Sequence, residues 1–322
     1  MQIFKNPNFD FVRWRWPALA LSIVVIAAGM LLIGTRGLQK GVDFEGGTIV
    51  ILKFAQSPDT GRIQDAVGQA TVQRYGVSEE NQVMIRVPST GQEAGGSLSN
   101  EADRLVSTLK AANVGSFELV GTKIVGPIVG EQLRRQGIWA TVLALAGILI
   151  YIALRFQFSF AVGAVVATVH DLLVCLAFLS FFRYDMTLNV IAGLLTITGY
   201  SVNDTIVIFD RVRENMRSSR RDNLRSIVNT AVNQTLARTV ITAGTTLLSV
   251  VALYLFGGEV LEGFAFTMMV GIISGTYSTV FIASSIAIML QRSKTTRGQS
   301  TKGSATATQP PAAVRPSRRR AS

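Results

Sequence analysis

Apolar residues along this chain gather in six long runs that are separated by polar connections. The runs cover residues 17–34, 137–154, 159–182, 187–209, 239–256 and 263–290. A helix of about 20 residues spans ~30 Å of hydrocarbon. The pattern therefore predicts six transmembrane helices. We expect the first to be a retained helix, because no small-residue cleavage site follows it.

The long connection between the first two runs, residues 35–136, has the mixed pattern of a soluble domain. Residues 48–54, 82–87 and 116–125 resemble strands, 59–75 and 100–112 have helical periodicity, and 90–97 is a Gly-rich loop. This alternation predicts a small α+β sandwich, for which the ferredoxin-like fold is the candidate. Its sequence offers no nucleophile–base pair, histidine or metal-ligand cluster, so we interpret it as a binding or mechanical domain.

Composition and charge favour a membrane protein over a soluble or nucleic-acid-binding one. Hydrophobic residues make up 48% of the chain and charged residues 16%, and the net charge is +11. Lys and Arg gather before the first run, in the second-to-third and fourth-to-fifth connections, and after the last run. By the positive-inside rule, residues 1–16 and 291–322 are cytoplasmic, and residues 35–136 lie outside. We expect the basic tail to be disordered and to lie near anionic lipid; contact with ribosomal RNA is the alternative.

One carboxylate, Asp204, interrupts the fourth apolar run. A charge at bilayer depth costs at least ~2.5 kcal/mol, so such a residue usually faces protein or water and serves transport. Arg238 is the only charge between residues 226 and 259, and it enters the fifth run from the same side as Asp204. We expect the two to meet, forming either a proton relay or a static ion pair that fixes the register of the helices. Asn203 is a further polar candidate.

A second candidate pair, His170 and Asp171, lies in the third run. Histidine titrates near neutral pH and could accept a proton; a buried, hydrogen-bonded pair is the alternative. We interpret Asp43 and Glu45, in a glycine-rich stretch, as an acidic turn without ligands. We interpret Cys175 as a small apolar packing residue. Gly271 and Gly275 are spaced as a helix-packing face. Without a P-loop or a Ser/His/Asp arrangement, the sequence predicts no ATP site, no cofactor and no enzyme.

Several motifs together carry a resemblance to a known family. They lie at residues 41–47 (GVDFEGG), 125–130 (VGPIVG), 167–171 (ATVHD), 199–215 (GYSVNDTIVIFDRVREN), 234–239 (QTLART) and 254–258 (YLFGG). In this order they closely resemble the SecF subunits of the SecD/SecF protein-export family, in the RND superfamily. The resemblance covers roughly residues 1–292.

The resemblance implies a polytopic six-helix half of an RND-type transporter with a periplasmic domain, in the bacterial inner membrane. It implies that proton motive force helps to complete preprotein translocation, with SecD, the SecYEG channel and YajC as partners. Asp204 and Arg238 match the family's intramembrane acid and arginine, and a further acid belongs to SecD. Two alternatives stay open: a stand-alone exporter of small molecules or lipids, and a scaffold that couples no proton.

Overall fold

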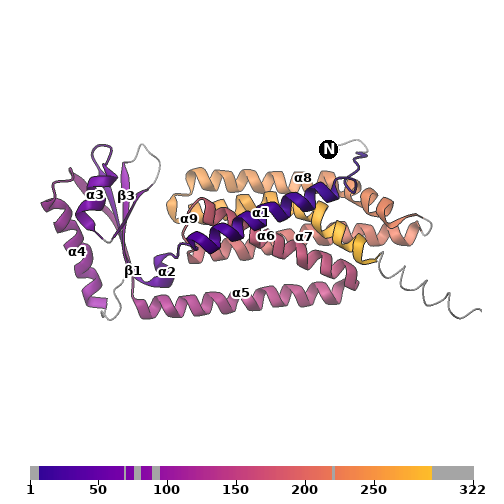
Figure 1. The fold of residues 1–322 in the computed structure, drawn as a ribbon, viewed down its shortest axis with the longest axis horizontal. Helices are drawn as coiled ribbons and strands as arrows, with labels where there is room; N and C mark the ends of the chain where they lie inside the picture. Colours follow the sequence, from indigo (N-terminus) through magenta and orange to yellow (C-terminus); the bar gives the residue numbers. More distant parts are fainter. Residues whose placement is uncertain (1–6, 69, 76–80, 89–94, 220–221, 292–322) are drawn as a thin grey trace, which may run out of the picture.

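The computed structural model describes residues 7–68, 70–75, 81–88, 95–219 and 222–291. A bundle of long helices makes up most of the molecule, and a small α+β domain sits at one end of it (Figure 1). Six of the helices are long and apolar enough to cross a membrane. The predicted polytopic helical fold is therefore confirmed.

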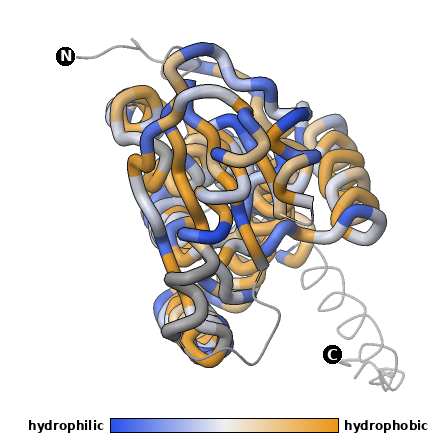
Figure 2. The backbone as a smooth tube through the Cα atoms, turned by 90° about the vertical axis from the view of Figure 1, so that its left-hand side faces the viewer, coloured by the Kyte–Doolittle hydropathy of each residue, from blue (hydrophilic) through white to orange (hydrophobic). Residues whose placement is uncertain are grey.

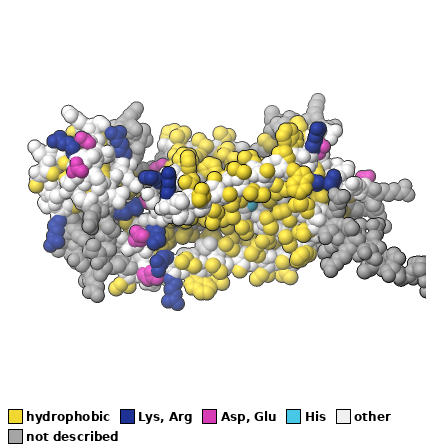
Figure 3. Space-filling model, in the orientation of Figure 1, with side chains coloured by type: hydrophobic (Ala, Val, Ile, Leu, Met, Phe, Trp, Pro, Cys, Tyr) yellow, Lys and Arg dark blue, Asp and Glu magenta, His cyan; other side chains and the backbone are white. Residues whose placement is uncertain are grey.

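Five of the six membrane helices are longer than their apolar runs, and α6 (Phe158–Phe181) has the same length as its run. The six helices are α1 (Arg15–Arg36), α5 (Pro127–Arg155), α6, α7 (Leu188–Ser218), α8 (Leu224–Phe256) and α9 (Glu259–Ser278), which continues through the π-helical turn η2 (Thr279–Ala283) to residue 291. Helix α5 begins at Pro127, and helix α8 begins after its N-cap Asn223. Both residue types favour a helix start, so these two helices begin well before their apolar runs. Figure 3 shows hydrophobic side chains over the visible face of the bundle, with charged side chains near its ends and on the α+β domain.

Helices α6, α7 and α9 form the centre of the bundle. The most apolar stretches of α6 and the last helix are 56% and 67% buried, whereas those of α1, α5 and α8 are 17%, 11% and 17% buried. The predicted small-residue face is confirmed, because a Cβ on Gly271 would lie 2.2 Å from Ile197 Cγ1 and one on Gly275 would lie 3.1 Å from Ser201 Cβ. Glycine thus lets α9 approach α7 closely.

The α+β domain has the βαββαβ order of a ferredoxin-like fold. Its elements are β1 (Gly47–Phe54), α3 (Thr60–Val67), β2 (Thr71–Tyr75), β3 (Gln82–Pro88), α4 (Gly95–Ala111) and β4 (Phe117–Val125). The antiparallel sheet has the order β2-β3-β1-β4. Leu52 from β1, Ile63 from α3 and Leu109 from α4 are fully buried in its core. Figure 2 looks onto this domain and shows hydrophobic and hydrophilic segments alternating along it.

Two element predictions in this domain are wrong. The helix expected over 59–75 ends at Val67, and Thr71–Tyr75 forms β2 instead. Gly68 has a φ of +64°, a conformation that glycine adopts readily and that ends the helix. The second helix begins at Gly95 rather than at residue 100, so residues 95–97 of the expected loop are helical, and residues 90–94 lie outside the described chain.

Candidate functional site

Asp204 lies in the membrane-spanning part of α7, half-buried against α8. Its Oδ1 accepts a hydrogen bond of 2.8 Å from Thr239 Oγ1. Its Oδ2 is buried and has no hydrogen-bond partner among the described residues. A buried carboxylate oxygen without a partner is costly, and such oxygens are rare unless they have a function. The site therefore has an open position for a proton, water or a donor from another chain.

The ion pair expected between Asp204 and Arg238 is absent. No described ion pair within 4.0 Å includes Arg238. Arg238 and Thr239 are consecutive in α8, and consecutive helical side chains point ~100° apart. Thr239 is buried toward α7, whereas Arg238 is exposed. Arg238 therefore acts on Asp204 only through its charge, and Asn203, the other polar candidate here, is also exposed.

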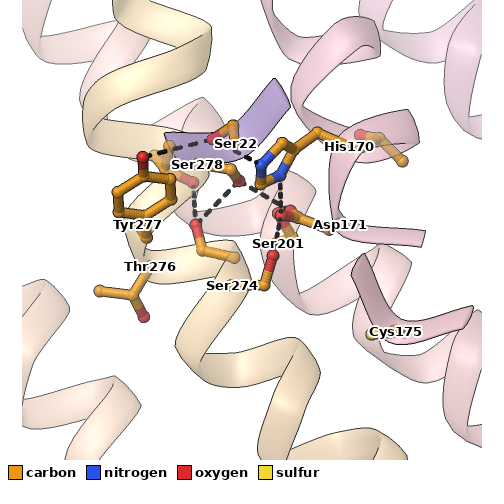
Figure 4. Close-up of polar contacts among 12 residues, drawn as sticks. Ser22, His170, Asp171, Cys175, Ser201, Ser274, Thr276, Tyr277 and Ser278 are labelled. Carbon is orange, nitrogen blue, oxygen red and sulfur yellow. Dashed lines mark hydrogen bonds and ion pairs between the residues drawn. The ribbon is translucent and has the colours of Figure 1, made fainter. Parts of the chain in front are cut away.

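His170 and Asp171 form a second polar cluster, in the middle of the bundle (Figure 4). Asp171 is 1% exposed, and its carboxylate accepts from three serine hydroxyls: Ser201 at 2.6 Å, Ser274 at 2.7 Å and Ser278 at 2.8 Å. His170 Nδ1 lies 3.0 Å from Asp171 Oδ1. These four partners occupy the roughly four acceptor positions of a carboxylate. Asp171 is thus saturated, in contrast to Asp204.

The cluster extends from His170 to α1. His170 Nε2 lies 3.0 Å from Ser22 Oγ, and Ser22 also contacts Tyr277, whose hydroxyl donates to the Ala18 carbonyl at 2.6 Å. The cluster therefore joins α1, α6, α7 and α9. Its serines could have been noticed in the sequence, because Ser274 and Ser278 are four residues apart and share a helix face, but nothing there showed which helix they meet.

The π-helical turn η2 brings this cluster close to the Asp204 segment. The turn begins at Thr279, directly after Ser278, and Thr279 Oγ1 lies 3.0 Å from Thr205 Oγ1 in α7. Both threonines are buried. Thr205 follows Asp204, so the two polar regions share neighbouring turns of α7. Single π-helical turns occur frequently at functional sites.

The start of α7 is bonded to the α+β domain through the short helix α2 (Val42–Glu45). Asp43 is 5% exposed. Its Oδ2 accepts from the backbone N–H of Leu188 at 3.1 Å, and its Oδ1 accepts from Lys123 Nζ of β4 at 2.7 Å. The plain acidic turn expected from the sequence is thus a buried connection between the sheet and α7.

Further contacts surround Asp43, and we call this region, residues 39–43 with 185–188, the joint. The Gly41 N–H donates to the Met186 carbonyl at 2.8 Å. Arg86 of β3 forms an ion pair with Asp185, and burial lowers the pKa of Arg86 while the charges of Glu45 and Asp43 oppose that shift. From Leu188 to Asp204 α7 rises roughly 24 Å. One continuous helix therefore connects the joint to the intramembrane carboxylate.

Comparison with known families matches two regions of the chain. Residues 31–58 match the SecD/SecF GG motif, which includes α2 and Asp43. Residues 105–293 match the C-terminal region of protein export membrane protein SecD/SecF, which includes both polar regions of the bundle.

Relatives named protein translocase subunit SecF match most of the chain. The protein from Desulfurispirillum indicum is 42% identical over 283 residues, which cover 85% of this chain and 89% of that protein. The protein from Vibrio alginolyticus is 39% identical over 295 residues, covering 90% and 92%. The protein from Escherichia coli O157:H7 is 38% identical over 290 residues, covering 88% of each.

Solved structures of SecDF share the fold. The crystal structure of SecDF from Thermus thermophilus, a translocon-associated membrane protein, has a TM-score of 0.79 and 30% identity over 89% of this chain. A second SecDF structure, in a super-membrane-facing form, has a TM-score of 0.69 and 31% identity over 92% of this chain. This chain spans 39% and 41% of those longer chains.

Proposed function

Because the chain belongs to the SecD/SecF family of protein export membrane proteins, we propose that it is a SecF-type auxiliary subunit of the Sec protein translocase. In this proposal it is a multi-pass protein of the inner membrane that works with SecD. Together they use the proton motive force to complete preprotein translocation and release. The SecF-named relatives and the fold shared with SecDF support the partnership.

One observation carries the coupling part of the proposal. Asp204 has one unpartnered oxygen inside the membrane span, on the helix whose first residue is bonded to the α+β domain. Proton binding to Asp204 removes a charge and turns the carboxyl group into a donor. The proposal includes a second conformation, in which Oδ2 meets Arg238 or a polar group of SecD. A proton gradient then shifts the population between two positions of α7.

The joint transmits that shift to the α+β domain. Asp43 holds the start of α7 and β4 at the same carboxylate, so an axial or tilting movement of α7 reaches the sheet directly. The ion pair between Arg86 and Asp185 adds a second connection, to β3. The α+β domain is therefore the element that would act on the emerging preprotein.

We assign a different role to His170 and Asp171. The saturated carboxylate of Asp171 holds α6 and α9 together and bonds α7 through Ser201, while Asp204 carries the proton. Together α6 and α9 give α7 a defined support against which to move.

The charges at the two ends of the bundle support an orientation in the membrane. Arginines concentrate at the end of α7 and the start of α8, the end opposite the α+β domain. We propose that this end is cytoplasmic and that residues 35–136 are periplasmic, with 1–16 and 291–322 inside. SecYEG, YajC and a translocating preprotein are the further partners in this arrangement, with no ATP bound by this chain.

The test is late export in membrane vesicles that contain the SecD partner. We expect Asp204→Asn to abolish the stimulation of reporter release by the proton motive force, while co-purification with SecD stays intact. Asp210→Asn, on the same helix and paired with Arg155 at 2.9 Å, is the matched control and should behave as wild type. Normal stimulation in Asp204→Asn would favour the uncoupled scaffold.

The lining of two cavities does not suit the stand-alone exporter. These cavities, of about 520 and 490 Å³, lie at the start of α8 and the end of α7, and most of their lining residues are charged or polar. An exporter of small apolar molecules needs a mostly apolar site. The two functions can be separated further in vesicles that contain the protein. If a small apolar molecule dissipates no proton gradient across them, the result argues against the stand-alone exporter.

A further inference from the structure

A cavity of about 520 Å³ lies where the chain enters α1, beside the start of α8. The start of α1 lies at the end of the bundle away from the α+β domain (Figure 1). Three arginines line the cavity: Arg13 from the N-terminal segment, Arg15 from the first turn of α1, and Arg225 from the first turn of α8. Residues more than two hundred positions apart in sequence thus place their positive charges around one space.

The walls of this cavity are held in place by the protein itself. Asn229 Oδ1 accepts from the Phe11 N–H at 2.9 Å, and its Nδ2 donates to the Phe9 carbonyl at 2.9 Å. Asn233, one turn later in α8, bonds both the N–H and the carbonyl of Phe9 at 2.9 Å. The N-terminal segment is therefore fixed to α8, and a ligand would find the site already formed.

The lining carries an excess of positive charge. Asp10 is its one acid, and Asp10 Oδ1 accepts from the Arg13 N–H at 3.1 Å as part of the turn before α1. Ser226 adds a hydroxyl, and the start of α8 adds the positive end of a helix dipole. In the second cavity, by contrast, Asp210 and Glu214 offset the arginines, and Arg155 is already bonded to Asp210. The first cavity is the one suited to an anion.

The surroundings identify the anion as a lipid headgroup. Trp16 lines the cavity, and Trp14 precedes it by two residues in the chain. The two side chains are 61% and 65% exposed at the start of α1, the position in which tryptophans mark a membrane interface. The Arg15 guanidinium lies 5.6 Å from the Trp16 ring centre. Beyond it the outer face of α1 is apolar and open, with Leu21 and Val24 exposed. Acyl chains can follow this face while the phosphate sits among the arginines.

We propose that this cavity binds the phosphodiester headgroup of an anionic glycerophospholipid. Arg13 and Arg225 contact the phosphate oxygens, and Trp16 packs against the glycerol region. Basic pockets between membrane helices are suited to such headgroups. The bound lipid holds the N-terminal segment, α1 and the start of α8 together at one leaflet. This site is independent of the proton-coupling proposal.

The full-length chain, purified in a mild detergent and stripped of lipid, tests this directly. Short-chain phosphatidylglycerol, short-chain phosphatidylcholine and inorganic phosphate are each titrated, with bound lipid counted by native mass spectrometry and the thermal midpoint measured in parallel. We expect phosphatidylglycerol to bind at least about tenfold more tightly than phosphatidylcholine. Inorganic phosphate alone should neither bind measurably nor raise the midpoint.

Variants locate the site. The double variant Arg13→Gln/Arg225→Gln should lose the preference for phosphatidylglycerol, and Arg13→Lys/Arg225→Lys should retain most of it. Arg217→Gln removes one charge from the second cavity at the same end of the bundle and should bind as wild type. Equal binding of both lipids by the wild-type chain, an equal loss in Arg217→Gln, or full reproduction by inorganic phosphate would overturn the proposal.

Discussion

The carboxylate of Asp43 accepts a hydrogen bond from the backbone N–H of Leu188, at 3.1 Å, and so caps α7 from the α+β domain. The same carboxylate is 2.7 Å from Lys123 Nζ in β4. A buried side chain that satisfies a helix terminus usually contributes ~1 kcal/mol. Here it also decides how two parts of the molecule are connected.

Asp43→Ala should therefore weaken both stability and coupling. Loss of the cap and the ion pair is expected to lower the free energy of unfolding by about 1–3 kcal/mol. Stimulation of export by a proton gradient should fall further than stability alone explains. Glu45→Gln is the control, since its pair with Lys40 at 3.3 Å is half exposed and such pairs are worth ~0–1 kcal/mol. If a proton gradient stimulates export equally in Asp43→Ala and Glu45→Gln, the proposed role of the joint is contradicted.

Two glycine substitutions should change stability in opposite directions. Gly271→Ala places a Cβ 2.2 Å from the side chain of Ile197, and overpacking of this kind costs about 1–3 kcal/mol. Gly147→Ala in α5 meets nothing within 4 Å and should stabilise the helix by about 0.5–1 kcal/mol. Thermal midpoints in one detergent measure both. A Gly271→Ala midpoint at or above that of wild type would show that α9 and α7 pack less closely.

The serine cluster should affect stability without affecting proton coupling. Ser274→Ala and Ser278→Ala each remove one hydrogen bond to Asp171, at 2.7 and 2.8 Å. Within membranes such bonds are worth about 0.5–2 kcal/mol. Both variants should therefore unfold at lower temperature. The pH at which gradient-driven export is half-maximal should stay where it is in wild type, and a displaced midpoint would make Asp171 a proton carrier.

Tyr184, in the connection between α6 and α7, should make stability fall at high pH. Its hydroxyl donates to Glu262 at 2.6 Å and contacts Tyr254 at 3.1 Å. Burial, and then these hydrogen bonds, raise the pKa of Tyr184. An unfolded tyrosine loses its proton near pH 10, whereas the folded one keeps it, so this contribution is complete below pH 10 and is lost as pH rises above it.

Thermal midpoints at pH 8 and pH 10.5 measure this effect. The decrease between the two values should be smaller in Tyr184→Phe than in wild type. Tyr151→Phe, on the exposed side of α5, should decrease as wild type does. Parallel decreases in all three proteins would remove Tyr184 from the pH response.

The local pattern of apolar and polar residues predicted most helices and strands correctly. It did not predict how each helix is rotated about its own axis. Six apolar runs specify six helices, because hydrocarbon thickness fixes their length. The sequence pattern extends the helix over residues 71–75 because they follow α3 closely, whereas the positive φ of Gly68 ends that helix. Asp204 was identified from its isolation in an apolar run. That Thr239 rather than Arg238 meets it depends on the rotation of α8 by ~100°, which the packing of the whole bundle determines.

The same reason accounts for the Asp171 cluster. Its donors Ser201, Ser274 and Ser278 lie in two helices far along the chain, and the π-helical turn that follows them has no sequence signature. Asp43 was visible as an acid in a glycine-rich stretch. Its connection to Leu188 arises only once the α+β domain is seated on the bundle.

Proton flux through the complex with SecD tests the central claim most directly. The complex is reconstituted in liposomes that contain a pH-sensitive dye, and a pH gradient is imposed in the presence of a translocating preprotein. Wild type and Asp210→Asn should both dissipate the gradient, and Asp204→Asn should do so no faster than empty liposomes. Flux through Asp204→Asn equal to that of wild type would contradict the assignment of Asp204 as the proton carrier of this chain.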